Sequence, residues 1–196
     1  MSAPLFALLL SGGNSRRMRT DKALLEYAGR PQLLRTWDML QQVNVAKVAV
    51  SINPDQREEA VRAGLPTLVD RFDSVGPVAG LLSAQLAEPD AGWLVVACDL
   101  PLLDVATLES LIKARAPNCD ATVFDSRHDG LPEPLCAIWE PSSTQLLKQR
   151  YEAGLYCPRS ALLQLRTQRL PSPGQALDNV NTPEELIQAQ RQLELN

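Results

Sequence analysis

The chain has 196 residues, of which 45% are hydrophobic and 21% charged, and its formal net charge is −4. These values are typical of one globular domain with its own core, so we expect a single domain over residues 1–196. The net negative charge argues against a general nucleic-acid-binding surface. The apolar start is too short for a membrane span and lacks the basic segment of a secretory signal, so we expect a cytoplasmic protein that binds no membrane.

Apolar runs that predict strands alternate with segments whose apolar residues recur at helical spacing. In chain order, the sequence predicts a strand over 4–10, a helix over 31–43, a strand over 47–52, a helix over 55–64, a strand over 66–70, a helix over 77–88, a strand over 93–99, a helix over 104–116, strands over 121–124 and 135–140, and helices over 142–154, 159–165 and 182–195.

Repeated strand–helix–strand units predict an α/β fold, a three-layer α/β/α sandwich with a mostly parallel, Rossmann-like sheet. The continuous apolar run over 4–10 suits a strand buried on both faces. Asp104 is expected to cap its helix, and Thr182, Pro183 and Glu185 form a capping box at the start of the last helix.

The longest stretches without a predicted element are 11–30, 70–76, 125–133 and 166–180. In open parallel sheets, ligands bind at the carboxyl ends of the strands. The loops after the first, third and fourth strands begin at Ser11, Asp70 and Asp99, so we expect these three residues at one rim of the sheet.

The four cysteines form no CxxC motif, and His128, the single histidine, has no neighbour at ligand spacing. A zinc site is therefore not expected. We expect four reduced thiols in Cys98, Cys119, Cys136 and Cys157.

The loop after the first strand combines glycines with a cluster of positive charge. Gly12 and Gly13 allow the backbone to approach a ligand closely, and Lys22 follows three arginines, Arg16, Arg17 and Arg19. These cations suit the oxygens of a triphosphate, although the loop matches neither of the two common phosphate-binding motifs. A glycine turn with a solvated basic face is the alternative.

The segment LSGGNSRRMRTDK, followed by GRP, resembles the signature L-x-G-G-x-S-x-R-M-G-x-D-K of nucleotidyltransferases with a glycosyltransferase-A-type fold. Within them it is most similar to the molybdenum cofactor guanylyltransferases. Four further motifs match in order and extend the resemblance over nearly the whole chain: GPVAG at 76–80, ACDLP at 97–101, EPLCAIW at 133–139 and NVNTPEE at 179–185. The resemblance implies the sheet architecture of the nucleotide-diphospho-sugar transferases.

The resemblance also implies a reaction, the Mg²⁺-dependent transfer of GMP from GTP to the phosphate of molybdenum-molybdopterin with release of pyrophosphate. The attacking phosphate oxygen already carries its charge, so no nucleophilic side chain is required. Catalysis then consists mostly of positioning and of neutralising charge.

The motifs assign roles to individual residues. Asp99, which follows an apolar strand, is the expected metal ligand, with an aspartate that caps a helix or a turn as the alternative. Lys22 and Arg17 are the expected catalytic cations, and Arg16 could take the place of Arg17.

The nucleotide is expected to contact a set of backbone and side-chain groups at the same rim. Backbone amides of the first loop and of the 76–80 segment would select the base, and the resemblance favours guanine. The expected nucleotide-binding residues are Leu10, Ser11, Gly12, Gly13, Lys22, Ser51, Asp70, Gly80 and Asp99.

Asn179 and Asn181 are expected to close the site and contact the acceptor, unless Asn181 only caps the last helix. Arg159, Lys148 and Arg166 offer local positive charge for the acceptor's phosphate. The chain departs from the family pattern at Ser11, where alanine is usual, and at Arg19, where glycine is usual.

Two classes of alternative stay open. One keeps the chemistry but changes the substrate: cytidylyl transfer to the same pterin, or nucleotidyl transfer to another small phosphate. The other is a regulatory nucleotide-binding module without turnover, for which Asp99→Ala and Lys22→Ala would have no activity to remove. As the acceptor is labile, we also expect transient contacts with other cofactor-assembly proteins.

Overall fold

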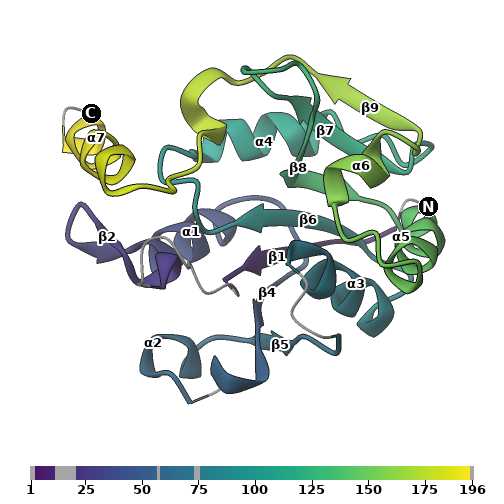
Figure 1. Ribbon diagram of the computed structural model, residues 1–196, viewed down its shortest axis with the longest axis horizontal. Coiled ribbons are helices and arrows are strands. Elements are labelled where there is room, and N and C mark those ends of the chain that lie inside the picture. Colours follow the sequence, from purple (N-terminus) through teal and green to yellow (C-terminus); the bar gives the residue numbers. More distant parts are fainter. Residues whose placement is uncertain (1–2, 12–20, 57, 73–75, 195–196) are drawn as a thin grey trace.

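The computed structural model describes residues 3–11, 21–56, 58–72 and 76–194 (Figure 1). Seven strands form one sheet in the spatial order β5-β4-β1-β6-β8-β7-β9. They are β1 (Leu5–Leu10), β4 (Lys47–Ile52), β5 (Thr67–Val69), β6 (Gly92–Ala97), β7 (Ala121–Asp125), β8 (Pro132–Trp139) and β9 (Thr167–Leu170).

The sheet is mixed but mostly parallel. β5, β4, β1 and β6 run side by side in one direction, β8 is antiparallel to both β6 and β7, and β9 is parallel to β7. A separate two-stranded ribbon pairs β2 (Glu26–Tyr27) with β3 (Arg30–Pro31). The expected α/β architecture with a mostly parallel sheet is therefore confirmed, and one strand is reversed.

Helices cover both faces of the sheet (Figure 1). They are α1 (Gln32–Leu40), α2 (Ala60–Ala63), α3 (Pro77–Ala87), α4 (Val105–Lys113), α5 (Thr144–Glu152), α6 (Pro158–Leu162) and α7 (Pro183–Glu194). The predicted caps are present. The Asp104 carboxylate accepts from the Thr107 amide at 2.7 Å, and Thr182 and Glu185 exchange two side-chain-to-backbone bonds at the start of α7.

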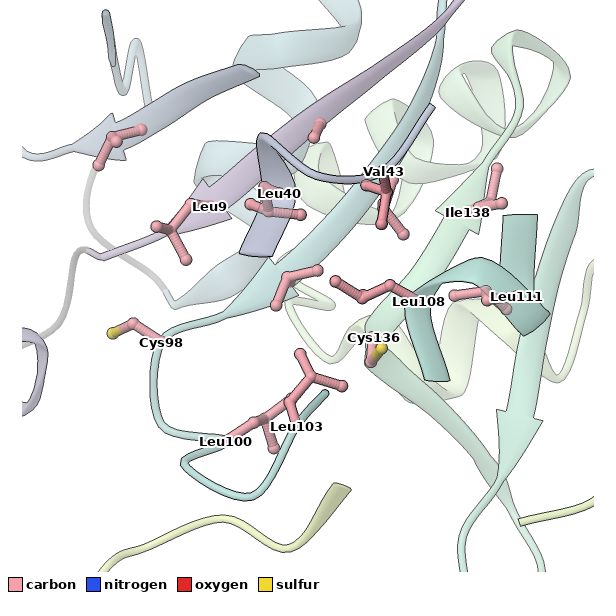
Figure 2. Packing of buried hydrophobic residues seen from close by; sticks show 14 of the residues in the cluster. Leu9, Leu40, Val43, Cys98, Leu100, Leu103, Leu108, Leu111, Cys136 and Ile138 are labelled. Atoms are coloured by element: carbon pink, nitrogen blue, oxygen red, sulfur yellow. The ribbon is translucent and has the colours of Figure 1, made fainter. Parts of the chain in front are cut away.

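The core lies in two layers because side chains alternate across the central strand. All six residues of β1 are buried. Leu5, Ala7 and Leu9 belong to a cluster on the α1 and α4 side, whereas the residues between them pack on the α3, α5 and α6 side. Figure 2 shows part of the first cluster, in which Leu40 of α1 and Leu108 of α4 pack over the sheet. Burying each such leucine contributes about 1.5–3 kcal/mol to the stability of the fold. The packed core therefore holds the sheet rigid beneath the loops at its edge.

Three segments differ from the sequence predictions. The helix predicted over 55–64 is a single 3₁₀ turn, Pro54–Gln56, and the four-residue α2. β9 lies within the stretch 166–180, for which the sequence predicts no element. In the stretch 11–30, likewise without a predicted element, the chain forms β2, and β3 begins at its last residue, Arg30. β9 is an edge strand of sequence TQRL with two exposed residues, so it has no apolar pattern by which to predict it.

None of the helices in the described part of the chain is long and apolar enough to cross a membrane. All four cysteines are free thiols; Cys98 and Cys136 are buried, and burial raises the pKa of Cys136 to about 12. The described residues contain no group of three or more His, Cys, Asp and Glu side chains placed to hold a metal together.

Candidate active site

A cavity of about 230 Å³, the rim cavity, opens at the carboxyl ends of the parallel strands. Its walls come from β1, β4, β6 and β8, from the loops that follow β1, β5 and β6, and from the start of α3. It is lined by Leu10, Ser11, Asp21, Lys22, Ser51, Asp70, Gly76, Pro77, Gly80, Ala97, Cys98, Asp99 and Leu135. This set contains every expected nucleotide-binding residue that the structure describes.

The strand register explains why residues so far apart in sequence meet here. Leu10 pairs with Ser51 on one side and with Ala97 on the other, so β1, β4 and β6 end at the same level. The Asp70 amide donates to the Ile52 carbonyl at 2.9 Å and continues the pairing of β5 with β4. Asp99 follows β6 by two residues, and the three predicted loop starts therefore share one rim.

Lys22 and Asp99 form an ion pair inside the cavity. The Lys22 Nζ lies 3.1 Å from Asp99 Oδ2 and donates to Asn181 Oδ1 at 2.6 Å. Both charged side chains are 18% exposed, so the pair is screened less than a surface pair would be. The carbonyl of Asp99 also accepts from the Val180 amide at 3.0 Å, which fixes the segment before α7 beside the cavity.

The second carboxylate oxygen of Asp99 is suited to a cation. Oδ1 is buried and has no hydrogen-bond partner among the described residues. A buried, unpaired acceptor is costly unless a ligand or water completes it. Mg²⁺ typically binds one or two carboxylates together with substrate phosphates and keeps several waters, so Asp99 fits such an ion without a larger protein cage.

Ser51, Asp70 and Gly80 are tightly packed on the opposite wall. The Ser51 hydroxyl donates to Asp70 Oδ1 at 2.7 Å. A Cβ added to Gly80 would lie 2.3 Å from Ser51 Oγ and 2.9 Å from Leu10 Cδ2, so only glycine lets α3 approach this closely. Gly76, which directly precedes α3, has φ +91°, a conformation that other residues rarely adopt.

Burial raises the pKa of Asp70 above its ordinary value of 3.8, and the hydrogen bond from Ser51 opposes this effect. The folded state therefore disfavours the charged carboxylate, and this penalty is present at neutral pH but absent below the unfolded pKa. We expect Asp70→Asn to raise the melting temperature at about pH 7, with the gain shrinking as the pH falls toward about 4. Thermal melts across this range test it, and a gain independent of pH would contradict this origin.

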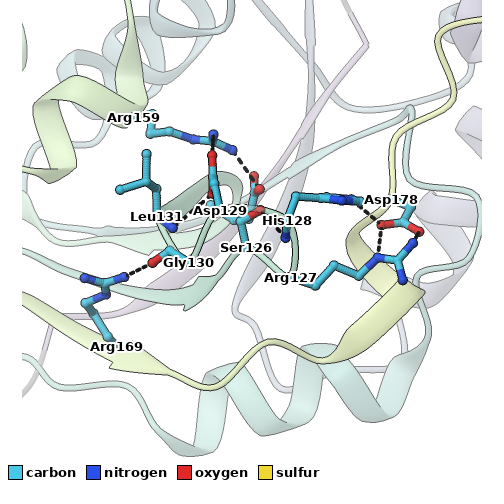
Figure 3. Close-up of polar contacts among 10 residues, drawn as sticks. Ser126, Arg127, His128, Asp129, Gly130, Leu131, Arg159, Arg169 and Asp178 are labelled. Carbon is cyan, nitrogen blue, oxygen red and sulfur yellow. Dashed lines mark hydrogen bonds and ion pairs between the residues drawn. The ribbon is translucent and has the colours of Figure 1, made fainter.

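The two asparagines of the last motif have different surroundings. Both line a second cavity of about 380 Å³, but Asn181 also accepts a hydrogen bond from Lys22, whereas the Asn179 side chain is exposed. Beside them, Asp178 accepts from Arg127 at 2.7 and 2.6 Å and lies 3.1 Å from the His128 ring, as Figure 3 shows. These contacts hold the loop between β7 and β8 against the segment that carries both asparagines.

The other candidate cations for the acceptor are engaged elsewhere. Arg159 pairs with Asp129 and Glu133 (Figure 3), and Arg166 pairs with Asp120. Lys148 lies on α5, 58% exposed, with Glu152 3.9 Å away. None of the three lines either cavity.

Part of the predicted site cannot be compared with the structure. Gly12, Gly13, Arg16, Arg17 and Arg19 lie outside the described residues, and their roles stay predictions.

Two charged residues at the cavity were not singled out from the sequence. Asp21 precedes Lys22 in the first motif and lines the cavity. Arg62, on α2, is fully buried behind it. No signal in the sequence marks Arg62, because its segment predicts an ordinary surface helix.

The family model of the MobA-like NTP transferase domain matches residues 7–168. A "Molybdenum cofactor guanylyltransferase" of Pseudomonas paraeruginosa is 34% identical over 92% of both chains. A "Molybdenum cofactor biosynthesis bifunctional protein" of Synechocystis is 38% identical over 93% of this chain, which spans only 52% of that protein. The crystal structure of molybdopterin-guanine dinucleotide biosynthesis protein A from Archaeoglobus fulgidus superposes with a TM-score of 0.82 over 97% of this chain and 100% of that one, at 21% identity, and so shares its fold. By the extent of the family match, this chain belongs to the MobA-like NTP transferases.

Proposed function

We propose that the chain transfers GMP from GTP to the phosphate of molybdenum-molybdopterin and releases pyrophosphate. The observation that carries the reaction class is the Lys22–Asp99 pair in the rim cavity, with Asp99 Oδ1 buried and unpartnered among the described residues. The choice of GTP and of the pterin acceptor rests on the guanylyltransferases that are about one-third identical over nine-tenths of the chain.

In the proposed reaction an acceptor phosphate oxygen attacks the α-phosphorus of GTP, and the bond to the β-phosphate oxygen breaks. Lys22 neutralises charge on the phosphates, because its ammonium uses two of three N–H donors on Asp99 and Asn181 and can turn the third toward a phosphate oxygen. Asn181 holds this ammonium in place and also lines the second cavity, in which we place the acceptor. Asn179 would contact the acceptor from the second cavity, and Arg17 is proposed from the sequence alone as a further cation.

Mg²⁺ is the proposed metal, held by Asp99 through its unpartnered Oδ1, while Lys22 on the other carboxylate oxygen would bind the phosphates. When bound, the ion would supply charge neutralisation at the phosphate oxygens. The chain itself fixes the Asp99 backbone through the hydrogen bond from the Val180 amide to its carbonyl, and Lys22 contacts its carboxylate.

The nucleotide is proposed to lie along the rim from Ser51 and Asp70 to Lys22 and Asp99. Leu10 and Ser11 would line the site of the base, and Gly12 and Gly13 are proposed from the sequence alone to offer backbone groups to it. The bare backbone at Gly80 lets α3 pack closely against Ser51 and Leu10 at this wall. Transient contacts with other cofactor-assembly proteins would deliver the labile pterin directly.

A competition reaction tests the choice of base. The protein is mixed with Mg²⁺, molybdenum-loaded molybdopterin and equal GTP and CTP, and the dinucleotides are identified by mass spectrometry. We expect the guanine product to exceed the cytosine product at least about tenfold, since hydrogen-bonded base recognition discriminates strongly. A cytosine product would keep the chemistry and overturn the base, and no product with a competent acceptor would contradict the proposed function.

A further inference from the structure

Arg62 carries a fully buried charge just behind the wall of the rim cavity. Its side chain has 0% exposure, although α2 is only four residues long and lies at the surface. Burying a guanidinium is unfavourable unless anions and acceptors surround it. Here Asp21 and Glu59 both pair with it.

The guanidinium joins two separate parts of the cavity wall. Its Nη2 donates to the Ser11 carbonyl at 3.0 Å and to Asp21 Oδ2 at 2.8 Å, and its Nε donates to Ser11 Oγ at 3.1 Å. Ser11 in turn donates to the Ser51 carbonyl at 3.0 Å. Arg62 therefore holds the end of β1 and the residue before Lys22 at fixed positions.

Asp21 in turn fixes the short turn on which Lys22 lies. Its other oxygen, Oδ1, accepts from the Ala23 amide at 3.0 Å and caps the 3₁₀ turn Lys22–Leu24. Gln56 lies 3.4 Å from Oδ2 and adds a weaker contact. Rotation of the Asp21 carboxylate would release the cap of the turn on which Lys22 lies.

The charged side chains that line the cavity explain what a buried cation does there. The described charged residues that line it are Asp21, Asp70 and Asp99, opposed by Lys22 alone. A triphosphate is strongly anionic, so an uncompensated Asp21 beside Lys22 would repel it and would compete with it for the ammonium.

We propose that Arg62 is a positioning residue for nucleotide binding: it neutralises Asp21 and fixes both Asp21 and Ser11, so that Lys22 stays available to the triphosphate. This inference rests on the proposed function. It predicts that the effect of Arg62 on GTP binding depends on the negative charge of Asp21.

The test is a double-mutant cycle on the full chain, with Mg²⁺·GTP binding measured by calorimetry and folding by thermal melts. Arg62→Gln is expected to weaken GTP binding by about tenfold, the size expected of one uncompensated charge near the ligand. When Asp21→Asn is already present, the same change should cost less than about threefold, because the carboxylate that lines the cavity beside Lys22 is gone. Asparagine keeps an oxygen that can accept from the Ala23 amide.

Arg115→Gln is the matched control. Arg115 is also largely buried and makes a bidentate pair with Glu140 at 2.6 and 2.8 Å, but it adjoins Gly92 at the opposite end of β6. It should lower the melting temperature and leave GTP affinity unchanged. If Arg62→Gln behaves in the same way, or costs the same with and without Asp21→Asn, Arg62 is only structural and the inference is wrong.

Asp21→Asn alone keeps the test decisive even where Arg62→Gln does not fold. It should bind GTP at least as tightly as the unaltered chain, and weaker binding would contradict the inference. Two failures can be told apart. If the unaltered chain binds no Mg²⁺·GTP, the proposed function fails, and this inference fails with it. If the unaltered chain binds Mg²⁺·GTP and Arg62→Gln binds it equally well, only this inference fails.

Discussion

Asp99→Asn is expected to lower kcat/KM for nucleotidyl transfer about 10³-fold, equivalent to about 4 kcal/mol of transition-state stabilisation. Asparagine keeps an oxygen that can accept from Lys22, so the fold should be retained. It removes the negative charge that would hold Mg²⁺, and it replaces one of the two carboxylate oxygens by a donor. Initial rates of pyrophosphate release at varied GTP and Mg²⁺ measure the effect.

Asp104→Asn is a matched control for this change. Asp104 follows in the same connection after β6, and its carboxylate caps α4. Asparagine caps helices about as well as aspartate, so activity and stability should both be nearly unchanged. Equal activity of Asp99→Asn and Asp104→Asn would show that Asp99 only shapes a turn.

Lys22→Met should lower kcat/KM about 10²-fold, because it removes the ammonium that neutralises phosphate charge in a partly buried site. The methionine keeps most of the side-chain volume. Asp99 and Asn181 both lose their described side-chain partner, so some loss of stability should accompany the loss of rate. Steady-state kinetics, together with thermal melts, separate the two effects.

Lys47→Met is the control for the loss of one lysine charge. Lys47 is 61% exposed and pairs with Glu88 at the amino end of β4, far from the rim cavity. Its change should leave the rate unaltered. Should Lys22→Met retain the rate of the unaltered chain, Lys22 would be a structural partner of Asp99 with no catalytic role.

The elements that sequence reasoning predicts well here are those with a strong apolar pattern. β1 and β6 are continuous apolar runs that are buried along their whole length, and α3 is bounded by Gly76 and Pro77 at its start. β9 was missed because an edge strand of polar residues has no such pattern. The direction of β8 depends on long-range pairing, which neither its composition nor its length indicates.

The site residues also differ in how well the sequence predicts them. Asp99, Asp70 and Ser11 could be placed together from topology, because parallel strands end at one edge. The contact between Lys22 and Asn181 spans most of the chain and is visible only in three dimensions. Arg62 could not be found, since its role depends on how a short segment bends so that a charged side chain is buried behind Ser11 and Asp21.

The most direct test of the central claim follows the α-phosphate of the nucleotide. GTP labelled at the α-phosphorus is incubated with the protein, Mg²⁺ and molybdenum-loaded molybdopterin, and the products are separated. Our account predicts that the label enters a guanine dinucleotide in step with pyrophosphate release, and that Asp99→Asn abolishes most of this transfer. Label that stays in GTP, or that leaves as free GMP while the pterin is unchanged, would contradict nucleotidyl transfer at this cavity.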